Sequence, residues 1–469
     1  MNRRTVLAFA AGPLANAALG FISLPLVAWI FSTEDIGRNN VYQVFISFSL
    51  LVFVLGLDQA YVREYHECNS RGRLFRVCYL CSVFALFVFI LVSAPFAHEL
   101  AIFLYGVEEP LLYLVSLSCV FIELTSRFLS LIVRMQERGF AYSAGQVLQK
   151  MVFILTLLFY VFLDVKPAYQ NLLFSNFVAG LALLFIFVWN SRAQLLDAVS
   201  ERIDREQLRT LLQFGLPLVA AGVAYWGLRA TSTIAIRTFS DFDELGLYAM
   251  AMSFAGIATI FQMVFSTVWM PLVYKWVANN ENLEKIDAIH SQVLAIACCI
   301  LSAAGGLSWL VDYVLPAAYT EVKYLLVATM VQPLLYLLSE TTVVGMNIKR
   351  KTGYAVVISL AALSVNILIS IVLTPHFGAA GASVANAIAF FVFFIGRTEA
   401  SSRVWRPVAR KRMYLVLCLY IAFACFTSMY GNRYALEVPI IWTCILLFTV
   451  VFFRADLRDA ARIVFDRKK

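Results

Sequence analysis

The chain has 469 residues, of which 61% are hydrophobic and only 14% charged, and its mean hydropathy is +0.80. Soluble domains are roughly 45–50% apolar and about 25% charged, so this composition excludes a soluble enzyme and predicts an all-α integral membrane protein. The net charge is +8, but Lys and Arg lie in short gaps between apolar runs instead of along one face, so we expect no nucleic-acid partner.

Apolar runs between polar breaks predict about fourteen transmembrane helices. The predicted spans are residues 6–31, 41–61, 76–97, 111–132, 143–163, 170–190, 211–237, 246–274, 288–310, 323–346, 353–374, 378–396, 413–430 and 437–453. Arg3 and Arg4 precede the first run, which is longer than the apolar core of a signal peptide. We therefore interpret it as an uncleaved first span.

The loop charges predict the orientation. With a cytoplasmic amino terminus, the inner segments hold 29 of the 37 Lys and Arg residues, the outer loops hold five and three lie inside spans. Positive charge marks cytoplasmic loops, so both termini are predicted to be cytoplasmic.

The chain is predicted to contain an internal repeat. Pro13 in the first span is matched by Pro217 in the seventh, and each span is followed by Phe-Ser, acidic residues and Gly, in segments 31–37 and 239–246. At such polar helix starts, Ser or Thr can cap the helix and acidic side chains suit its dipole. The predicted domains are a six-helix lobe (1–195), a cytoplasmic linker (196–210), a second six-helix lobe (211–400), a basic loop (401–412) and two additional helices with a basic tail (413–469). The amphipathic charge of residues 197–209 suggests a short surface helix in the linker, and the alternative is a solvated linker with no further role.

Three segments carry a family resemblance. They are Gly12-Pro13-Leu14-Ala15-Asn16 continuing to Leu26, the run from Gly56 to His66 that leaves the second span, and Gly378-Ala379-Ala380-Gly381-Ala382 at the start of the twelfth. In this order and at these positions the chain resembles the polysaccharide-transport (O-antigen, Wzx-type flippase) family of the multidrug/oligosaccharidyl-lipid/polysaccharide exporter superfamily.

The resemblance implies translocation of undecaprenyl-diphosphate-linked oligosaccharide repeat units between leaflets by alternating access, in O-antigen, lipopolysaccharide or other surface-polysaccharide biosynthesis. It also implies a location in the bacterial inner (plasma) membrane, with membrane lipid, a polysaccharide polymerase and chain-length proteins as partners. The first lobe departs from the pattern, because residues 164–171 before the sixth span are polar and lack Gly-x-x-Gly-Ala. Fourteen spans also resemble the peptidoglycan-precursor flippases, whose arginines in spans one, two and eight are missing here.

Arg229 is the main candidate for substrate binding. It lies about eighteen residues into the seventh span, with apolar turns on both sides. A charged side chain near the centre of a span costs about 2.5–3.5 kcal/mol on insertion scales, so it is a functional candidate by default. A guanidinium facing a cavity would bind a diphosphate or an acidic sugar through two hydrogen bonds. The alternatives are structural pairing and snorkelling to the outer surface.

Three further charged residues are predicted to line the cavity. Glu123 and Arg127 are four residues apart on span four and share a helix face, so they form either a packing salt bridge or a switch that releases the arginine to substrate. Lys150 belongs to a polar stripe with Gln146 and Gln149 at the inner end of span five, where snorkelling to the cytoplasm is the structural alternative.

Asp58 and Glu340 are weaker candidates for ion coupling. Both lie close to inner ends of spans, where Arg63 or Lys349 would be the structural partner. Proline inside a span frees backbone carbonyls and permits bending. The hinge candidates are Pro13, Pro25, Pro217 and Pro271, with Pro333 as a further interruption.

No cofactor, metal site or catalytic group is expected. The four histidines are far apart, most cysteines lie in apolar runs, and the sequence has no phosphate-binding loop of the Gly-x-x-x-x-Gly-Lys-Ser/Thr type. Two alternatives to a flippase remain: a cation-coupled multidrug exporter of the same superfamily, which requires an unpaired carboxylate deep in a lobe, and a membrane glycan polymerase or ligase, which generally needs a large outer loop.

Overall fold

The structure is a computed structural model that describes residues 3–68, 70–201, 204–279, 284–349, 351, 353–407 and 410–465, without the side chains of residues 3–11, 13, 205 and 461–465. The described residues form α-helices and short 3-10 helices and contain no strand, as predicted. Packing divides the chain into two compact units, Met1–Trp226 and Gly227–Lys469. The boundary falls within one helix, α9 (Arg205–Phe239).

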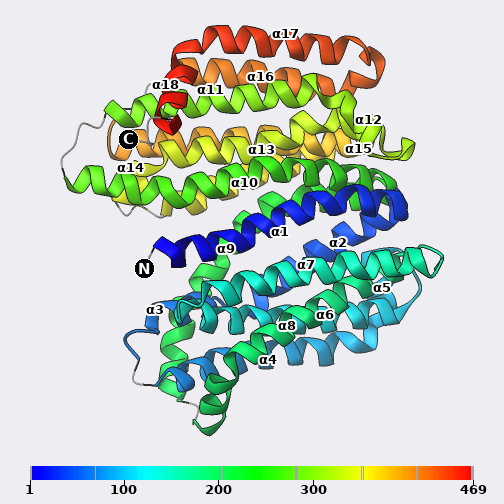
Figure 1. Ribbon diagram of the computed structural model, residues 1–469, viewed down its shortest axis with the longest axis vertical. Helices are drawn as coiled ribbons and strands as arrows, with labels where there is room; N and C mark the ends of the chain where they lie inside the picture. The colour runs from blue at the N-terminus through cyan, green and yellow to red at the C-terminus, as the bar shows by residue number, and fades with distance from the viewer. Residues whose placement is uncertain are drawn as a thin grey trace. The chain divides into compact units, whose positions relative to one another are not determined.

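The described residues of the first unit form eight α-helices before α9, among them α6, α7 and α8, which run side by side (Figure 1). They are α1 (Arg3–Ile30), α2 (Thr33–Phe53), α3 (Leu57–Glu64), α4 (Arg71–Ser93), α5 (Ala97–Tyr105), α6 (Pro110–Met135), α7 (Gly139–Phe162) and α8 (Tyr169–Ser200), with the 3-10 turn η1 (Ala94–Phe96) before α5. Helix α1 packs mainly on α7, and α6 packs on α8.

The predicted second span is broken. Helices α2 and α3 meet at an angle of 53°, because Leu55 and Gly56 take positive φ values of 58° and 68°. Gly56 lies directly against the backbone of Gly215 in α9, where an added Cβ would come within 2.4 Å of the Gly215 carbonyl oxygen. This close approach requires glycine at both positions.

The second unit continues from α9 with α10 (Phe242–Ala278), α11 (Glu284–Gly306), α12 (Val311–Val314), α13 (Val322–Thr342), α14 (Val344–Ile348), α15 (Gly353–Val404), α16 (Lys411–Tyr430), α17 (Glu437–Phe452) and α18 (Arg454–Phe465). Three 3-10 turns separate some of them: η2 (Ser308–Leu310), η3 (Ala317–Tyr319) and η4 (Gly431–Tyr434). Helix α13 is buried along most of its length and packs on α10, α11 and α15.

Helix starts in both units confirm the predicted caps. The Ser32 hydroxyl accepts a hydrogen bond from the amide of Asp35 (3.1 Å), and the Asp241 carboxylate accepts one from the amide of Glu244 (2.8 Å). In the second unit the cap is therefore the aspartate instead of the preceding Ser240. Both contacts satisfy an amide in the first turn that has no partner within the helix.

The Gly-Ala-Ala-Gly-Ala segment, residues 378–382, contains the kink in α15. Gly378 has φ 50° and ψ −127°, so α15 consists of two helices joined at this kink. The carboxylate of Glu244 accepts a hydrogen bond from the Ala379 amide at 2.7 Å and so caps the second of them. Gly381 packs against Leu373, whose carbonyl oxygen would lie 2.5 Å from an added Cβ.

Ten helices in the described residues are long and apolar enough to cross a membrane, or twelve if each of two bent pairs is one span. Large apolar side chains such as Phe84, Phe103 and Leu368 point outward, with 67%, 73% and 65% of their surface exposed. The chain is a multi-pass membrane protein, as its composition predicted. The number fourteen and the cytoplasmic termini stay predictions.

The separate surface helix predicted at residues 197–209 is wrong. Helix α8 continues to Ser200 and α9 begins at Arg205, so the polar residues extend two long helices. Glu201 ties the end of α8 to the start of α4 by accepting hydrogen bonds from Ser70 Oγ (2.6 Å) and Arg73 Nε (3.2 Å). These contacts, the Ser70 hydroxyl first and the Arg73 guanidinium second, lower the pKa of Glu201 below its usual value.

Candidate functional site

Asp58 forms an ion pair with Arg127 in the first unit. Arg127 donates to Asp58 Oδ2 through Nη2 at 2.5 Å and through Nε at 3.0 Å, which joins α3 to α6. The Asp58 side chain is 10% exposed, whereas that of Arg127 is 48% exposed. The structural alternatives for these residues paired Asp58 with Arg63 and Arg127 with Glu123. Both pairings are wrong, because the α2–α3 break brings Asp58 against α6.

Glu123 lies near the middle of α6 and faces α7 and α8. Its Oε1 accepts a hydrogen bond from Gln149 Nε2 at 2.9 Å. The same oxygen lies 4.0 Å from the position of an added Cβ on Gly180. Among the described residues no cation forms a salt bridge with Glu123, so this carboxylate has a neutral partner only.

Lys150 follows Gln149 on α7 and has an aromatic contact. Its Nζ lies 4.8 Å from the centre of the Phe153 ring, a distance typical of a cation–π interaction. An added Cβ on Gly20 of α1 would lie 3.9 Å from Lys150 Cε. No carboxylate in the described part of the chain pairs with Lys150, which leaves its ammonium donors for a ligand or for water.

Arg229 lies on the part of α9 that belongs to the second unit, and its side chain is exposed. It is within electrostatic range of the Tyr248 and Tyr336 hydroxyls. No described residue forms a hydrogen bond or salt bridge with it. The side chain is therefore a charged group within an apolar span whose counter-ion does not come from the described chain.

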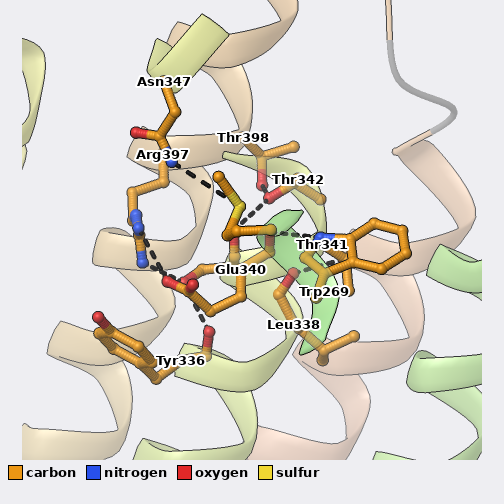
Figure 2. A network of polar contacts seen from close by, with 11 residues as sticks. Trp269, Tyr336, Leu338, Glu340, Thr341, Thr342, Asn347, Arg397 and Thr398 are labelled. Atoms are coloured by element: carbon orange, nitrogen blue, oxygen red, sulfur yellow. Dashed lines mark hydrogen bonds and ion pairs between the residues drawn. The ribbon is translucent and has the colours of Figure 1, made fainter. Parts of the chain in front are cut away.

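Glu340 pairs with Arg397 near the end of α13. Arg397 donates from Nη2 to Glu340 Oε1 at 3.1 Å and from Nη1 to Ser339 Oγ at 2.6 Å. Figure 2 shows the guanidinium pointing from α15 toward this carboxylate, beside Tyr336. The expected partner, Lys349, is therefore wrong, since Glu340 faces the neighbouring helix and not the loop that follows α13.

Side chains close to the Glu340–Arg397 pair also hold the end of α13, by contacting its backbone carbonyls. Trp269 Nε1 donates to the carbonyl oxygen of Glu340 (3.1 Å), and His290 Nε2 lies 2.7 Å from that of Thr341. The hydroxyls of Thr342 and Thr398 lie 2.8 Å apart (Figure 2). Carbonyls at a helix end lack intrahelical partners, so these side chains from three helices lock the end of α13 in place.

The hinge candidates lie within helices. Pro25 is inside α1, Pro217 inside α9 and Pro271 inside α10. The side chain of Pro13 lies outside those that the structure describes. Their role in bending stays a prediction.

Sequence reasoning missed Arg397 and its contacts. Arg397 directly follows the predicted span 378–396, and Phe393 and Phe394 precede it in that apolar run. An arginine directly after such a run is a signal of a buried or stacked guanidinium, and Arg397 does stack over the rings of Phe393 and Tyr336, each at 5.2 Å.

Two bundles of apolar helices with cations inside their spans define a multi-pass membrane protein with a transporter fold. The chain belongs to the family described as "Polysaccharide biosynthesis protein", whose model matches residues 3–277. No curated protein matches the sequence significantly.

Solved structures share the fold. The chain is similar to "Lipid II flippase MurJ, inward closed conformation", at 13% identity and a TM-score of 0.71, with 97% of this chain and 100% of that chain covered. It is also similar to an inward-facing multidrug resistance MATE family transporter of the MOP superfamily, at 14% identity and a TM-score of 0.57, with 83% and 95% covered. These similarities confirm the predicted fold.

Proposed function

We propose that the protein moves undecaprenyl-diphosphate-linked oligosaccharide repeat units, O-antigen-like or of another surface polysaccharide, from the cytoplasmic to the outer leaflet of the bacterial inner membrane. The lipid tail stays in the bilayer while the head group crosses, and alternating access exposes it to each side in turn. Membership of the polysaccharide biosynthesis family and the fold shared with a lipid flippase support this proposal.

Arg229 is the observation that carries the proposal. A guanidinium in a span with no described counter-ion is electrostatically unfavourable until an anion binds. A diphosphate meets this requirement, because its oxygens accept two parallel hydrogen bonds from the planar guanidinium. Lys150 is a further cation within a span that pairs with no carboxylate among the described residues, and its compact ammonium group suits phosphate as a point charge.

The other charged candidates are less suited to bind the diphosphate. Arg127 is held by Asp58, so it reaches substrate only with its exposed half or after the pair opens. Asp58 and Glu340 each neutralise an arginine, which favours structural roles over ion coupling. Glu123 carries negative charge when ionised and would repel a diphosphate.

The test is Arg229→Ala in a strain whose own gene is deleted, with surface polysaccharide and membrane-inserted protein measured together. Losing a bidentate charge-assisted contact worth about 1.5–3 kcal/mol should reduce transport about 10- to 100-fold. Arg209→Ala, on the same helix but before its apolar segment, is the matched control and should retain transport. Undiminished polysaccharide in Arg229→Ala would remove Arg229 from the mechanism.

The same strains separate the alternative functions. Lipid-linked repeat units should accumulate on the cytoplasmic leaflet when transport fails. Units that accumulate on the outer leaflet would instead indicate a polymerase or ligase. A change in drug accumulation with unchanged surface polysaccharide would indicate a multidrug exporter.

A further inference from the structure

A small cavity lies at one end of the second unit. Its volume is about 190 Å³, and the start of α10, the start of α13, the kink of α15 and the end of α16 with η4 surround it. The loop charges predict that these helix ends face outside. A water molecule occupies about 30 Å³ in the liquid, so the cavity has room for about six waters. A single sugar ring matches this size, whereas a whole oligosaccharide does not.

Two carboxylates line the cavity. Glu244 Oε2 accepts a hydrogen bond from the Ala379 amide at 2.7 Å, and its other carboxylate oxygen has no partner among the described residues. Glu321 directly precedes α13, and its side chain makes no capping hydrogen bond. The exposed Asn432 of η4 adds a side-chain amide that bonds to no described residue. The lining therefore offers free carboxylate oxygens and an amide to a ligand.

The Lys and Arg residues next to these groups in sequence are engaged elsewhere. Lys323, two residues after Glu321, donates from Nζ to Asp312 Oδ2 at 2.8 Å. The guanidinium of Arg433, next to Asn432, lies 5.9 Å from the centre of the Tyr430 ring. Neither cation is among the described residues that line the cavity. The carboxylates are thus acceptors for a group from outside the chain.

The rest of the wall is apolar and aromatic. Leu325 of α13, Phe377 of α15 and Met429 of α16 contribute to it, and the Phe377 ring centre lies 6.1 Å from that of Tyr430. Tyr324 also lines the cavity and is buried, so its ring is held by packing. A sugar ring has an apolar face of C–H groups and a rim of hydroxyls. It therefore needs an apolar wall together with a few placed hydrogen-bonding groups, and this cavity has both.

Exposed aromatic side chains surround the cavity at the predicted outer end. Tyr430 and Tyr434 flank Asn432 and are exposed. Trp309 and Tyr313, in the segment between α11 and α13, are exposed as well. Trp and Tyr gather at membrane–water interfaces, where the apolar part of the ring meets lipid and the polar group meets water. The first sugars of a lipid-linked glycan lie at this same depth.

A metal ion fits the cavity less well than a sugar. The part of the chain that the structure describes contains no group of three or more His, Cys, Asp or Glu that could hold one. One oxygen of Glu244 is already bonded to an amide, and hard cations prefer a shell of oxygens to a wall that includes Phe377 and Met429. The two carboxylates would repel a phosphate. The favoured occupant is therefore uncharged and rich in hydroxyls.

We propose that this cavity binds one sugar ring of a glycan at the predicted outer face. The carboxylates of Glu321 and Glu244 accept hydrogen bonds from its hydroxyls, and the Asn432 amide binds a further oxygen of the ring substituents. Phe377 and Tyr324 cover the C–H face. Hydroxyl-to-carboxylate bonds are strong because the acceptor is charged. The assignment of this sugar to the transported head group rests on the proposed function, whereas sugar binding itself does not.

The test uses the full-length protein in lipid nanodiscs that contain no sugar-based detergent. The probe is the repeat-unit oligosaccharide released by mild acid from the strain's own surface polysaccharide. Saturation-transfer difference NMR should show strong transfer from the protein to one sugar residue and weaker transfer to the others. Absence of transfer to the oligosaccharide would overturn the proposal. Equal transfer to all its residues would overturn a pocket for a single ring.

Variants of the lining locate the binding. Glu321→Ala should weaken binding about tenfold or more, because a charge-assisted hydrogen bond is lost, and Asn432→Ala should weaken it several-fold. Ala380→Leu should abolish it by filling the cavity with all charges unchanged. Glu437→Ala, at the exposed start of α17 and outside the lining, is the matched control and should bind like wild type. Wild-type affinity in both Glu321→Ala and Ala380→Leu would place the binding elsewhere and contradict the proposal.

The remaining outcomes separate this proposal from its rivals. Calcium chloride that binds in calorimetry to wild type and not to Glu321→Ala, without oligosaccharide binding, would replace the sugar by a metal ion. Wild type that binds the oligosaccharide but fails to restore surface polysaccharide to the deletion strain contradicts the proposed function and leaves the sugar pocket in place. Wild type that restores surface polysaccharide but does not bind the oligosaccharide contradicts the pocket alone.

Discussion

Arg127 and Asp58 lie 69 positions apart in the sequence, yet two hydrogen bonds of 2.5 Å and 3.0 Å join them. The pair leaves Glu123, one turn away from Arg127, without a cation partner among the described residues. Glu123 and Arg127 lie together in the sequence, but the geometry pairs the arginine with Asp58 of another helix and leaves Glu123 as a single carboxylate.

Asp58→Asn should lower the stability of the purified protein, because it leaves Arg127 without its counter-ion. Removing one partner of a fully buried pair costs about 3–5 kcal/mol, and the half-exposed guanidinium reduces this to about 1–3 kcal/mol. Thermal unfolding of Asp58→Asn, Arg127→Gln and the double variant measures the loss of stability in each. The double variant should lose less than the sum of the single variants; strict additivity would show that the pair contributes nothing.

Arg397→Ala should loosen the end of α13. The substitution removes the hydrogen bonds to Glu340 and Ser339 and leaves a carboxylate that is 11% exposed without its counter-ion. Amide hydrogen exchange of residues 336–342 should rise by about tenfold or more, in proportion to the 1–3 kcal/mol lost. Arg403→Ala, on the same helix, is the control. Equal exchange in both variants would contradict a locking role for Arg397.

Gly378→Ala should destabilise the second unit for two reasons. An added Cβ would meet Glu244 Oε2 at 2.4 Å, and the φ of 50° is unfavourable for alanine. Together these predict a loss of about 1–3 kcal/mol in thermal unfolding. In a Glu244→Ala background the clash disappears and only the backbone strain remains, so the penalty of Gly378→Ala should be smaller there. An equal penalty in both backgrounds would show that the clash is relieved by movement of Glu244.

Glu201 should make stability depend on pH. Hydrogen bonds from Ser70 and Arg73 lower its folded-state pKa, so its contribution is present above the unfolded value of about 4.3 and is lost as pH falls through the folded pKa. The difference in melting temperature between wild type and Glu201→Gln should therefore be largest near pH 7 and shrink below about pH 4. A difference that stays constant across this range would exclude the carboxylate charge as its cause.

The sequence alone determined the membrane class, the approximate positions of most spans, the helix caps at Ser32 and near Ser240, and the glycine-rich break before the twelfth span. These features depend on local composition and on residues a few positions apart, so hydropathy and capping chemistry are sufficient to predict them. The family resemblance also came from local segments, and the match over residues 3–277 confirms it.

Only the tertiary structure decided which charges meet. Neighbours in sequence suggested Arg63 for Asp58 and Lys349 for Glu340, whereas the partners are Arg127 and Arg397, carried in by other helices. Ion pairs in a bilayer depend on which helix faces turn toward each other, and a local kink such as that at Gly56 redirects every side chain after it. Packing between distant segments sets those faces, so the isolation of Glu123 is a property of the folded lobe.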